Sequence, residues 1–133
     1  MPAPDALIEA LEASGAVFEI IEVDPDLADT ADFCRHYGYP PEDSANTIVV
    51  RTKSGERRYA ACVLLATCRL DVNRTVRKKL EARKVSFAPE EETTLLTGMR
   101  SGGVTPIALP PDWPIWVDPL VLTRERIILG GGN

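Results

Sequence analysis

Apolar residues recur along the chain with two different periods, and each change of period marks an expected helix or strand. Helical spacing predicts amphipathic helices over residues 6–13, from 29 or 30 to 37, from 71 onward and from 89 to about 96. Gly15 and Gly38 follow the first two helices, and glycine readily adopts the left-handed backbone conformation that ends a helix. The acidic residues 90–92 lie at the start of the last helix, where the helix dipole favours negative charge.

Runs of β-branched and apolar residues predict strands over 17–23, 47–50, 59–65, 85–87, 115–117 and 126–129. A polar segment that contains Gly55 joins the second and third runs, which is a strong signal for a β-hairpin. Helices and strands do not alternate as βαβ units would. The pattern therefore favours an α+β fold, with a mostly antiparallel sheet flanked by helices, over a doubly wound sheet.

The composition is that of an ordinary globular protein. The chain has 133 residues, of which 44% are hydrophobic and 26% charged, and this predicts a single domain over residues 1–133. No apolar run reaches the length of about 20 residues that a membrane-spanning helix needs. The first residues have neither the positive charge nor the apolar stretch of a secretory signal, so we expect a cytoplasmic protein.

Charge is distributed unevenly along the chain. The net charge of −5 argues against broad affinity for nucleic acids, and acidic residues dominate as far as Asp43. A basic block follows later. It is either the solvated face of a helix or a surface that contacts a phosphate backbone. The block consists of Arg69, Arg74, Arg77, Lys78, Lys79, Arg83 and Lys84.

The three cysteines do not indicate a catalytic or metal site. Cys34, Cys62 and Cys68 lack C-x-x-C spacing, and Cys62 and Cys68 lie in or beside an apolar run. We expect reduced thiols, at least two of them buried. His36 is the only histidine, and it would lie on a different face of the helix from Cys34, so thiol catalysis is rejected.

Two glycine clusters stand out in the second half of the chain. Gly102 and Gly103 precede Val104, Thr105 and Pro106, and Gly130-Gly131-Gly132 follows the last apolar run. Glycine permits positive φ and close approach of another group, whereas proline fixes φ, so both clusters indicate shaped loops. From these residues alone, the loops either contact a ligand or are tight turns that join strands.

Several short blocks follow one another in order, from about residue 29 to the end of the chain. The blocks are Asn46-Thr47-Ile48-Val49-Val50, Tyr59-Ala60-Ala61-Cys62-Val63-Leu64-Leu65, Leu70-Asp71, Lys84-Val85-Ser86-Phe87-Ala88, Leu96-Thr97-Gly98, Gly102-Gly103-Val104-Thr105-Pro106, Val117-Asp118 and Gly130-Gly131-Gly132. In this order they resemble the YbaK/EbsC family of freestanding aminoacyl-tRNA editing domains, which includes the domain inserted in bacterial prolyl-tRNA synthetases. The resemblance implies an α+β domain with a curved, mostly antiparallel mixed sheet.

The resemblance also implies an activity. Such domains hydrolyse the ester that joins a small mischarged amino acid to the 3′ adenosine of tRNA, here by analogy tRNA-Pro, with a positioned water and without a metal or other cofactor. The implied partners are aminoacyl-tRNA and an aminoacyl-tRNA synthetase. This chemistry needs mainly orientation and hydrogen-bond donors aimed at the developing oxyanion, which backbone amides of a glycine loop can supply.

Site residues follow from the same resemblance. Gly103 is the expected catalytic donor, and the amino acid would lie beside Gly102, Val104, Thr105 and Pro106. Gly130 and Gly131 would let the terminal adenosine approach closely. Thr30 and Asp118 are further candidates for ligand contact, with helix capping and turn formation as their alternatives. The expected tRNA contacts come instead from the basic block: Arg74, Arg77, Lys78 and Lys79.

One residue departs from the family pattern. The family's functional lysine precedes the Thr-Leu/Ile-Val-Val strand, and this position is Asn46, which forms hydrogen bonds but carries no charge. Arg51 is no substitute, because five residues of extended strand separate the two by about 16 Å. Either Asn46 orients water or substrate as a catalytic residue, or hydrolysis is slow, or the protein is a non-catalytic module that binds tRNA or a synthetase. A small-molecule ester or thioester hydrolase is a third alternative.

Overall fold

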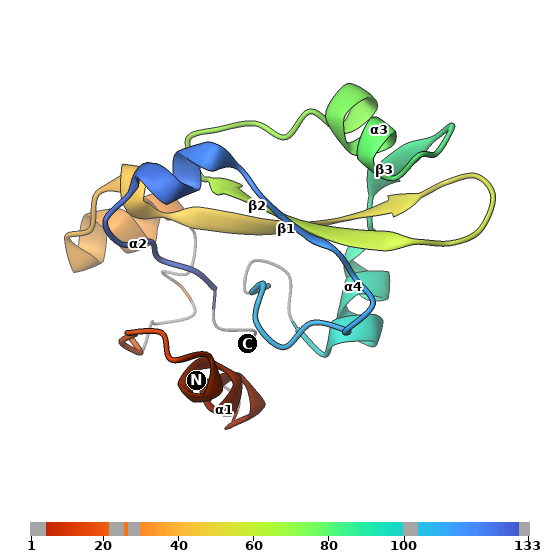
Figure 1. Cartoon of the computed structure of the whole chain (residues 1–133). Coiled ribbons are helices and arrows are strands. Elements are labelled where there is room, and N and C mark those ends of the chain that lie inside the picture. Colours follow the sequence, from red (N-terminus) through yellow and green to blue (C-terminus); the bar gives the residue numbers. More distant parts are fainter. Residues whose placement is uncertain (1–4, 22–25, 27–29, 100–103, 131–133) are drawn as a thin grey trace.

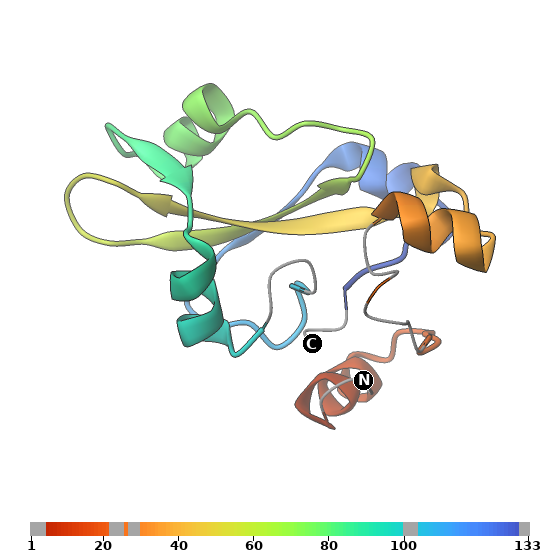
Figure 2. The same cartoon turned by 180° about the vertical axis from the view of Figure 1, so that it is seen from behind.

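The computed structural model describes residues 5–21, 26, 30–99 and 104–130, which form a four-stranded sheet with helices against it (Figures 1 and 2). No helix in these ranges is long and apolar enough to cross a membrane. The elements are, in chain order, α1 (Asp5–Ser14), α2 (Thr30–Tyr37), η2 (Pro41–Asp43), β1 (Ala45–Thr52), β2 (Tyr59–Leu65), η3 (Val72–Val76), α3 (Arg77–Lys79), β3 (Val85–Phe87), α4 (Glu90–Thr97), β4 (Ile115–Val117) and η4 (Pro119–Thr123).

The sheet has the strand order β3-β1-β2-β4. β1 and β2 form the expected hairpin and pair antiparallel along their whole length, from Ala45 opposite Leu65 to Arg51 opposite Tyr59. β3 is antiparallel to β1, whereas β4 is parallel to β2. The predicted α+β class with a mostly antiparallel mixed sheet is therefore confirmed.

Side chains on the two faces of the hairpin enter different cores, because successive residues of a strand point to opposite faces. On one face, Val50, Ala60 and Cys62 pack with Val76 and Leu80, which η3 and α3 bring over the sheet. α4 lies on the opposite face, as both ribbon views show. A second cluster, at the far end of the hairpin, is formed by Ala45, Val63, Leu65 and Val121.

The helix expected from residue 71 is less regular and shorter in the structure. It consists of the π-helical turn η3 followed by a single turn, α3. Its backbone opens with a bond from the Val76 N–H to the Asp71 C=O at 3.2 Å, five residues apart. The expected apolar side is confirmed, since both Val76 and Leu80 are buried.

Two expected strands are wrong in the described part of the chain. Residues 17–21 form no strand, and Val17 is fully exposed; residues 22–25 lie outside the described ranges. The run 126–129 makes only an isolated parallel bridge, between Ile128 and Ser44. In both segments the apolar pattern is real, but a strand also needs a partner edge.

Candidate functional site

Among the described residues, no strand pairs with the first half of β1 along its edge toward β3. β3 pairs only with Val50–Thr52, and Ala88 adds one bond, from its N–H to the Val49 C=O at 2.9 Å. At the start of the strand, the Ala45 N–H donates to the Ile128 C=O at 2.9 Å. Alternate residues of a strand direct their backbone groups to the same edge. Thr47, midway between these two contacts, therefore directs its N–H and C=O into the gap.

A hollow of about 280 Å³ lies at this gap. It is lined by Ala45, Asn46, Thr47, Ile48, Val104 and Gly130. Three of these, Asn46, Val104 and Gly130, are expected site residues from three separate segments of the chain. The fold thus brings together the position of the family lysine, the loop after α4 and the start of the second glycine cluster.

The described lining of the hollow combines polar and apolar groups and carries no charge. Asn46 is exposed and offers an amide that can donate and accept hydrogen bonds. The Thr47 hydroxyl is buried and has no hydrogen-bond partner among the described residues. The Asn46 amide and the Thr47 backbone groups suit a neutral polar ligand such as an ester, whereas the Thr47 hydroxyl is too buried to reach one. Ala45, Ile48 and Val104 supply apolar walls.

Thr47 was not singled out from the sequence, although it lies within the block that carries the family resemblance. Its side chain gives no chemical signal, because threonine is common in strands. What distinguishes Thr47 is the direction of its backbone groups and the lack of a partner strand at that point in the part of the chain that the structure describes. Only the signal of strand alternation, combined with knowledge of where β3 ends, could have identified it.

The remaining residues of the first glycine loop differ in their surroundings. Thr105 is only 2% exposed, and its hydroxyl accepts a bond from the Ile107 N–H at 3.5 Å. Pro106 is half-buried beside it. Thr105 thus bonds within its own turn, directly after Val104. The expected contacts at Gly102, Gly103 and Gly131 lie outside the described residues.

Two further candidates lie at the start of helices. Thr30 is the first residue of α2. The Asp118 carboxylate accepts a bond from the Leu120 N–H at 2.9 Å and so caps η4, while the Asp118 N–H donates to the Val63 C=O at 2.8 Å. Neither residue is among those that line the hollow. A role in substrate binding for either one stays a prediction.

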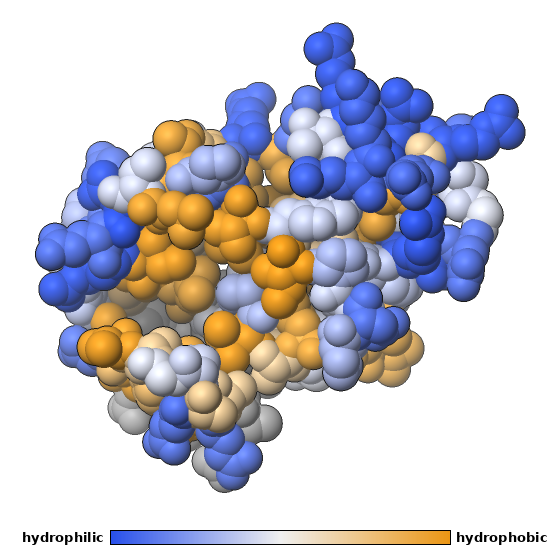
Figure 3. All heavy atoms as spheres, in the orientation of Figure 1, coloured by the Kyte–Doolittle hydropathy of each residue, from blue (hydrophilic) through white to orange (hydrophobic). Residues whose placement is uncertain are grey.

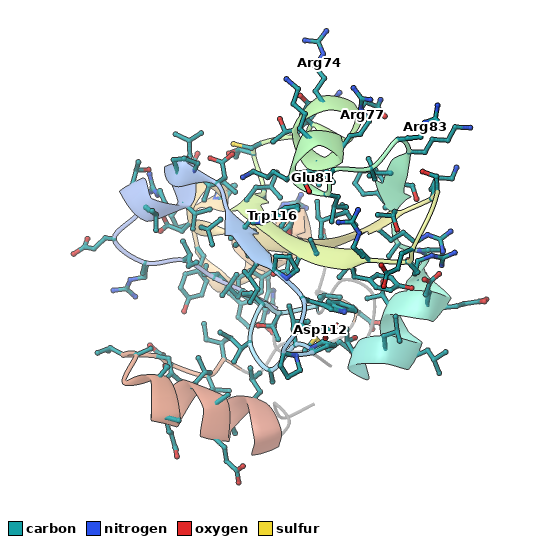
Figure 4. All side chains as sticks on the ribbon, turned by 45° about the vertical axis from the view of Figure 1, so that its right-hand side comes forward. Arg74, Arg77, Glu81, Arg83, Asp112 and Trp116 are labelled. Carbon is teal, nitrogen blue, oxygen red and sulfur yellow. The ribbon has the colours of Figure 1, made fainter. Side chains whose placement is uncertain are left out.

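The basic segment, defined here as Arg74, Arg77, Lys78 and Lys79, lies on η3 and α3 and is exposed. Arg74 and Arg77 point outward into solvent, together with Arg83 (Figure 4). The space-filling view shows hydrophilic residues gathered at this end of the molecule (Figure 3). The ammonium group of Lys79 lies 5.4 Å from the centre of the Trp116 ring, so this lysine also covers the core.

Arg51 does not replace the missing lysine. Its guanidinium Nη1 lies 2.7 Å from Glu92 Oε2 in α4, which commits its charge to an ion pair. Residues 46 and 51 are an odd number apart in the strand, so their side chains point to opposite faces. β1 therefore places no other cationic side chain where the family lysine would be.

The cysteines are free thiols, and Cys34 and Cys62 are buried, as expected. Burial raises the pKa of the Cys62 thiol to about 11, although Lys79 opposes the shift. The thiol stays protonated near neutral pH, and only a thiolate is a strong nucleophile. Among the described residues, no three His, Cys, Asp or Glu side chains lie close enough together to hold a metal ion.

Sequence and structure comparisons place these features among known proteins. A family model described as the aminoacyl-tRNA editing domain matches residues 24–133. The crystal structure of the hypothetical protein APE2540 matches with a TM-score of 0.84 and 28% sequence identity, over 97% of this chain and 83% of that one. The structure of a candidate trans-editing enzyme for prolyl tRNA synthetase matches with a TM-score of 0.79 and 21% identity, over 94% of this chain and 77% of that one.

Proposed function

Because the chain belongs to the aminoacyl-tRNA editing domain family, we propose that it is a trans-acting deacylase that removes a small mischarged amino acid from tRNA. The observation that carries the proposal is the hollow at the open edge of β1, where Asn46, Val104 and Gly130 converge. The similarity to a candidate trans-editing enzyme for prolyl tRNA synthetase supports tRNA-Pro as the tRNA and that synthetase as a partner.

The proposed mechanism depends on orientation rather than on a charged catalytic group. The acyl carbonyl would lie in the hollow, with its oxygen facing the Asn46 amide and the Thr47 N–H. Donors placed where negative charge develops stabilise the transition state. Water attacks the carbonyl carbon, the bond between this carbon and the ribose oxygen breaks, and the ribose oxygen takes up a proton. Because the described lining has no ionisable group, the neighbouring ribose hydroxyl of the substrate is the proposed proton carrier.

The dimensions and walls of the hollow support a small substrate. About 280 Å³ lies near the lower limit of ordinary small-molecule pockets, which start at roughly 300 Å³. This space suits an amino acid with a short side chain, while the rest of the tRNA stays outside. The apolar walls of Ala45, Ile48 and Val104 favour an aliphatic side chain over a charged one.

A panel of tRNAs tests the function directly. Each tRNA is charged with its cognate amino acid or with a smaller wrong one, and release of the amino acid is followed with and without the protein. We expect faster hydrolysis of at least one ester with a small wrong side chain, and no effect on the cognate esters. If no ester in the panel is hydrolysed, the deacylase proposal is wrong.

A non-catalytic binding module is the second candidate, and the replacement of the family lysine by Asn46 specifically favours it. In this case the protein would bind aminoacyl-tRNA in a salt-dependent manner without releasing the amino acid. The variant Asn46→Lys separates the two functions. If the wild type only binds tRNA, this variant should gain hydrolysis that the wild type lacks. A deacylase that already uses Asn46 would gain nothing comparable.

The basic segment is proposed to contact the tRNA backbone. We expect the triple variant Arg74→Ala, Arg77→Ala, Lys78→Ala to weaken tRNA binding and to reduce the salt dependence, by about 0.7–0.9 in the log–log slope for each phosphate that is no longer neutralised. Binding measured at several salt concentrations checks this expectation. Arg35→Ala, which removes an exposed arginine on α2, is the control and should leave the slope unchanged. An unchanged slope in the triple variant would mean that the segment is only a solvated surface.

A further inference from the structure

α4 is bound to the hairpin through one carboxylate. Glu92 Oε2 accepts a bond from Arg51 Nη1 at 2.7 Å, and Glu92 Oε1 accepts bonds from Arg57 Nη1 at 3.0 Å and from the Tyr59 hydroxyl. The Arg51 and Glu92 side chains are 19% and 22% exposed, so water screens this pair only weakly. Charge-assisted bonds of this kind are stronger than neutral ones. The start of α4 is therefore held firmly against β1 and β2.

Tyr59 also holds the chain on the other side of the glycine loop. Its ring stacks on Trp113, with the ring centres 5.0 Å apart and the planes 19° from parallel. Trp113 is buried, and the next residue, Pro114, accepts a bond from the Ala61 N–H at 2.9 Å. Tyr59 thus contacts an element before the loop, through its hydroxyl, and a segment after the loop, through its ring.

We propose that Glu92, Tyr59 and Trp113 act as a clasp that sets the position of the loop, and with it Val104, against Asn46. The clasp rests on the proposed deacylase function and deepens it. None of its residues lines the hollow, so these are positioning residues rather than catalytic ones. Glu92 in α4 and Trp113 after the loop are both anchored on the hairpin whose first strand carries Asn46. A displacement of about 1 Å in such an arrangement can cost about a hundredfold in rate.

A positioning role for these residues predicts a change in kcat that a purely structural role does not. If these residues only stabilised the fold, their conservative variants would lower the free energy of unfolding but leave kcat of the folded protein unchanged. If they position the loop, kcat falls in protein that is still fully folded. KM for tRNA stays the same in that case, because the basic segment lies on the opposite face of the sheet from α4.

Two conservative variants test the clasp. Tyr59→Phe keeps the ring stack and removes the hydroxyl, and Glu92→Gln keeps the shape of the side chain and removes its charge. We expect each to lower kcat of deacylation by about tenfold to a hundredfold, with little change in KM, measured well below the unfolding temperature. The matched controls are Tyr39→Phe, which contacts Phe33 elsewhere, and Glu91→Gln, an exposed neighbour in α4. Both controls should keep the wild-type kcat.

Hydrogen exchange gives a readout that does not need activity. In Tyr59→Phe and Glu92→Gln, the amides of Val104, Thr105 and Ile107 should exchange faster than in the wild type, while those of β1 and β2 should not. If the wild type hydrolyses no ester, the deacylase proposal fails and the exchange still tests the clasp. The clasp proposal is wrong if these amides exchange at the wild-type rate in both variants. It is also wrong if the wild type is active and both variants keep its kcat.

Discussion

Replacing Asn46 with alanine is expected to abolish deacylation while the protein stays folded. The side chain is exposed at the hollow, so its removal should change the free energy of unfolding by no more than about 0.5 kcal/mol. If the amide donates to the developing oxyanion, its removal costs about a hundredfold to a thousandfold in kcat. Single-turnover hydrolysis of the preferred mischarged tRNA measures the fall in rate, and thermal unfolding measures the stability.

Two further variants make the Asn46 result interpretable. Asn73→Ala removes another exposed asparagine, on η3 and outside the hollow, and it should keep the wild-type kcat. Asn46→Lys restores the charge of the family pattern and shows whether the site can use an ammonium group. Full activity in Asn46→Ala would remove this residue from the mechanism and leave the backbone of Thr47 as the donor on β1.

The variant Leu80→Ala is expected to lower the free energy of unfolding by about 2–5 kcal/mol, because it deletes buried methyl groups and leaves a cavity. Leu80 is 3% exposed and packs in the cluster that contains Val50 and Val76. A decrease of this size is a large part of the total for a small domain, which is about 5–15 kcal/mol. Denaturant unfolding followed by circular dichroism measures the change.

Leu122→Ala is the matched control for Leu80→Ala. The same chemical change is made at a leucine that is 77% exposed on η4, and we expect a difference within about 0.5 kcal/mol. The basic segment should bind tRNA more weakly in Leu80→Ala at temperatures where part of the protein is unfolded. Equal stability of the two variants would show that the cluster under α3 is not a true core.

The strands that were predicted well have a pattern that does not depend on distant parts of the chain. Residues 59–65 form an apolar run bounded by polar residues, and the run became β2 with all but its first residue buried. Gly98 follows α4 at φ 73°, so the end of this helix could also be inferred from the local sequence. In these elements, local preference and tertiary packing agree.

The predictions that failed concern segments whose state depends on a partner. The run 126–129 is as apolar as a strand, yet its one bridge is the pairing of Ile128 with Ser44, just before β1. Similarly, Glu92 looked like an ordinary acid at the start of a helix, whereas its three donors come from residues 33 to 41 positions earlier in the chain. No periodicity reveals such contacts, because they are set by the packing of α4 on the hairpin.

Only part of the candidate site was predictable, because some of its residues depend on local sequence and others on strand pairing. Asn46, Val104 and Gly130 were identified by the order of blocks along the chain, and the fold brings them to one hollow. Thr47 could not be identified, since its importance comes from the point at which β3 stops pairing with β1. The roles of all these residues in binding and hydrolysis stay predictions.

The short gap in the pairing of β1 also limits how another chain could pair with this edge. Unpaired strand edges are templates for aggregation, because another chain can extend the sheet there. Here the gap runs only from Ala45 to Val49, about 13 Å at the usual rise per residue, and each end is closed by a backbone bond. The bonds at its two ends limit a guest that pairs there to a short stretch of backbone, about the length of the pairing between β3 and β1.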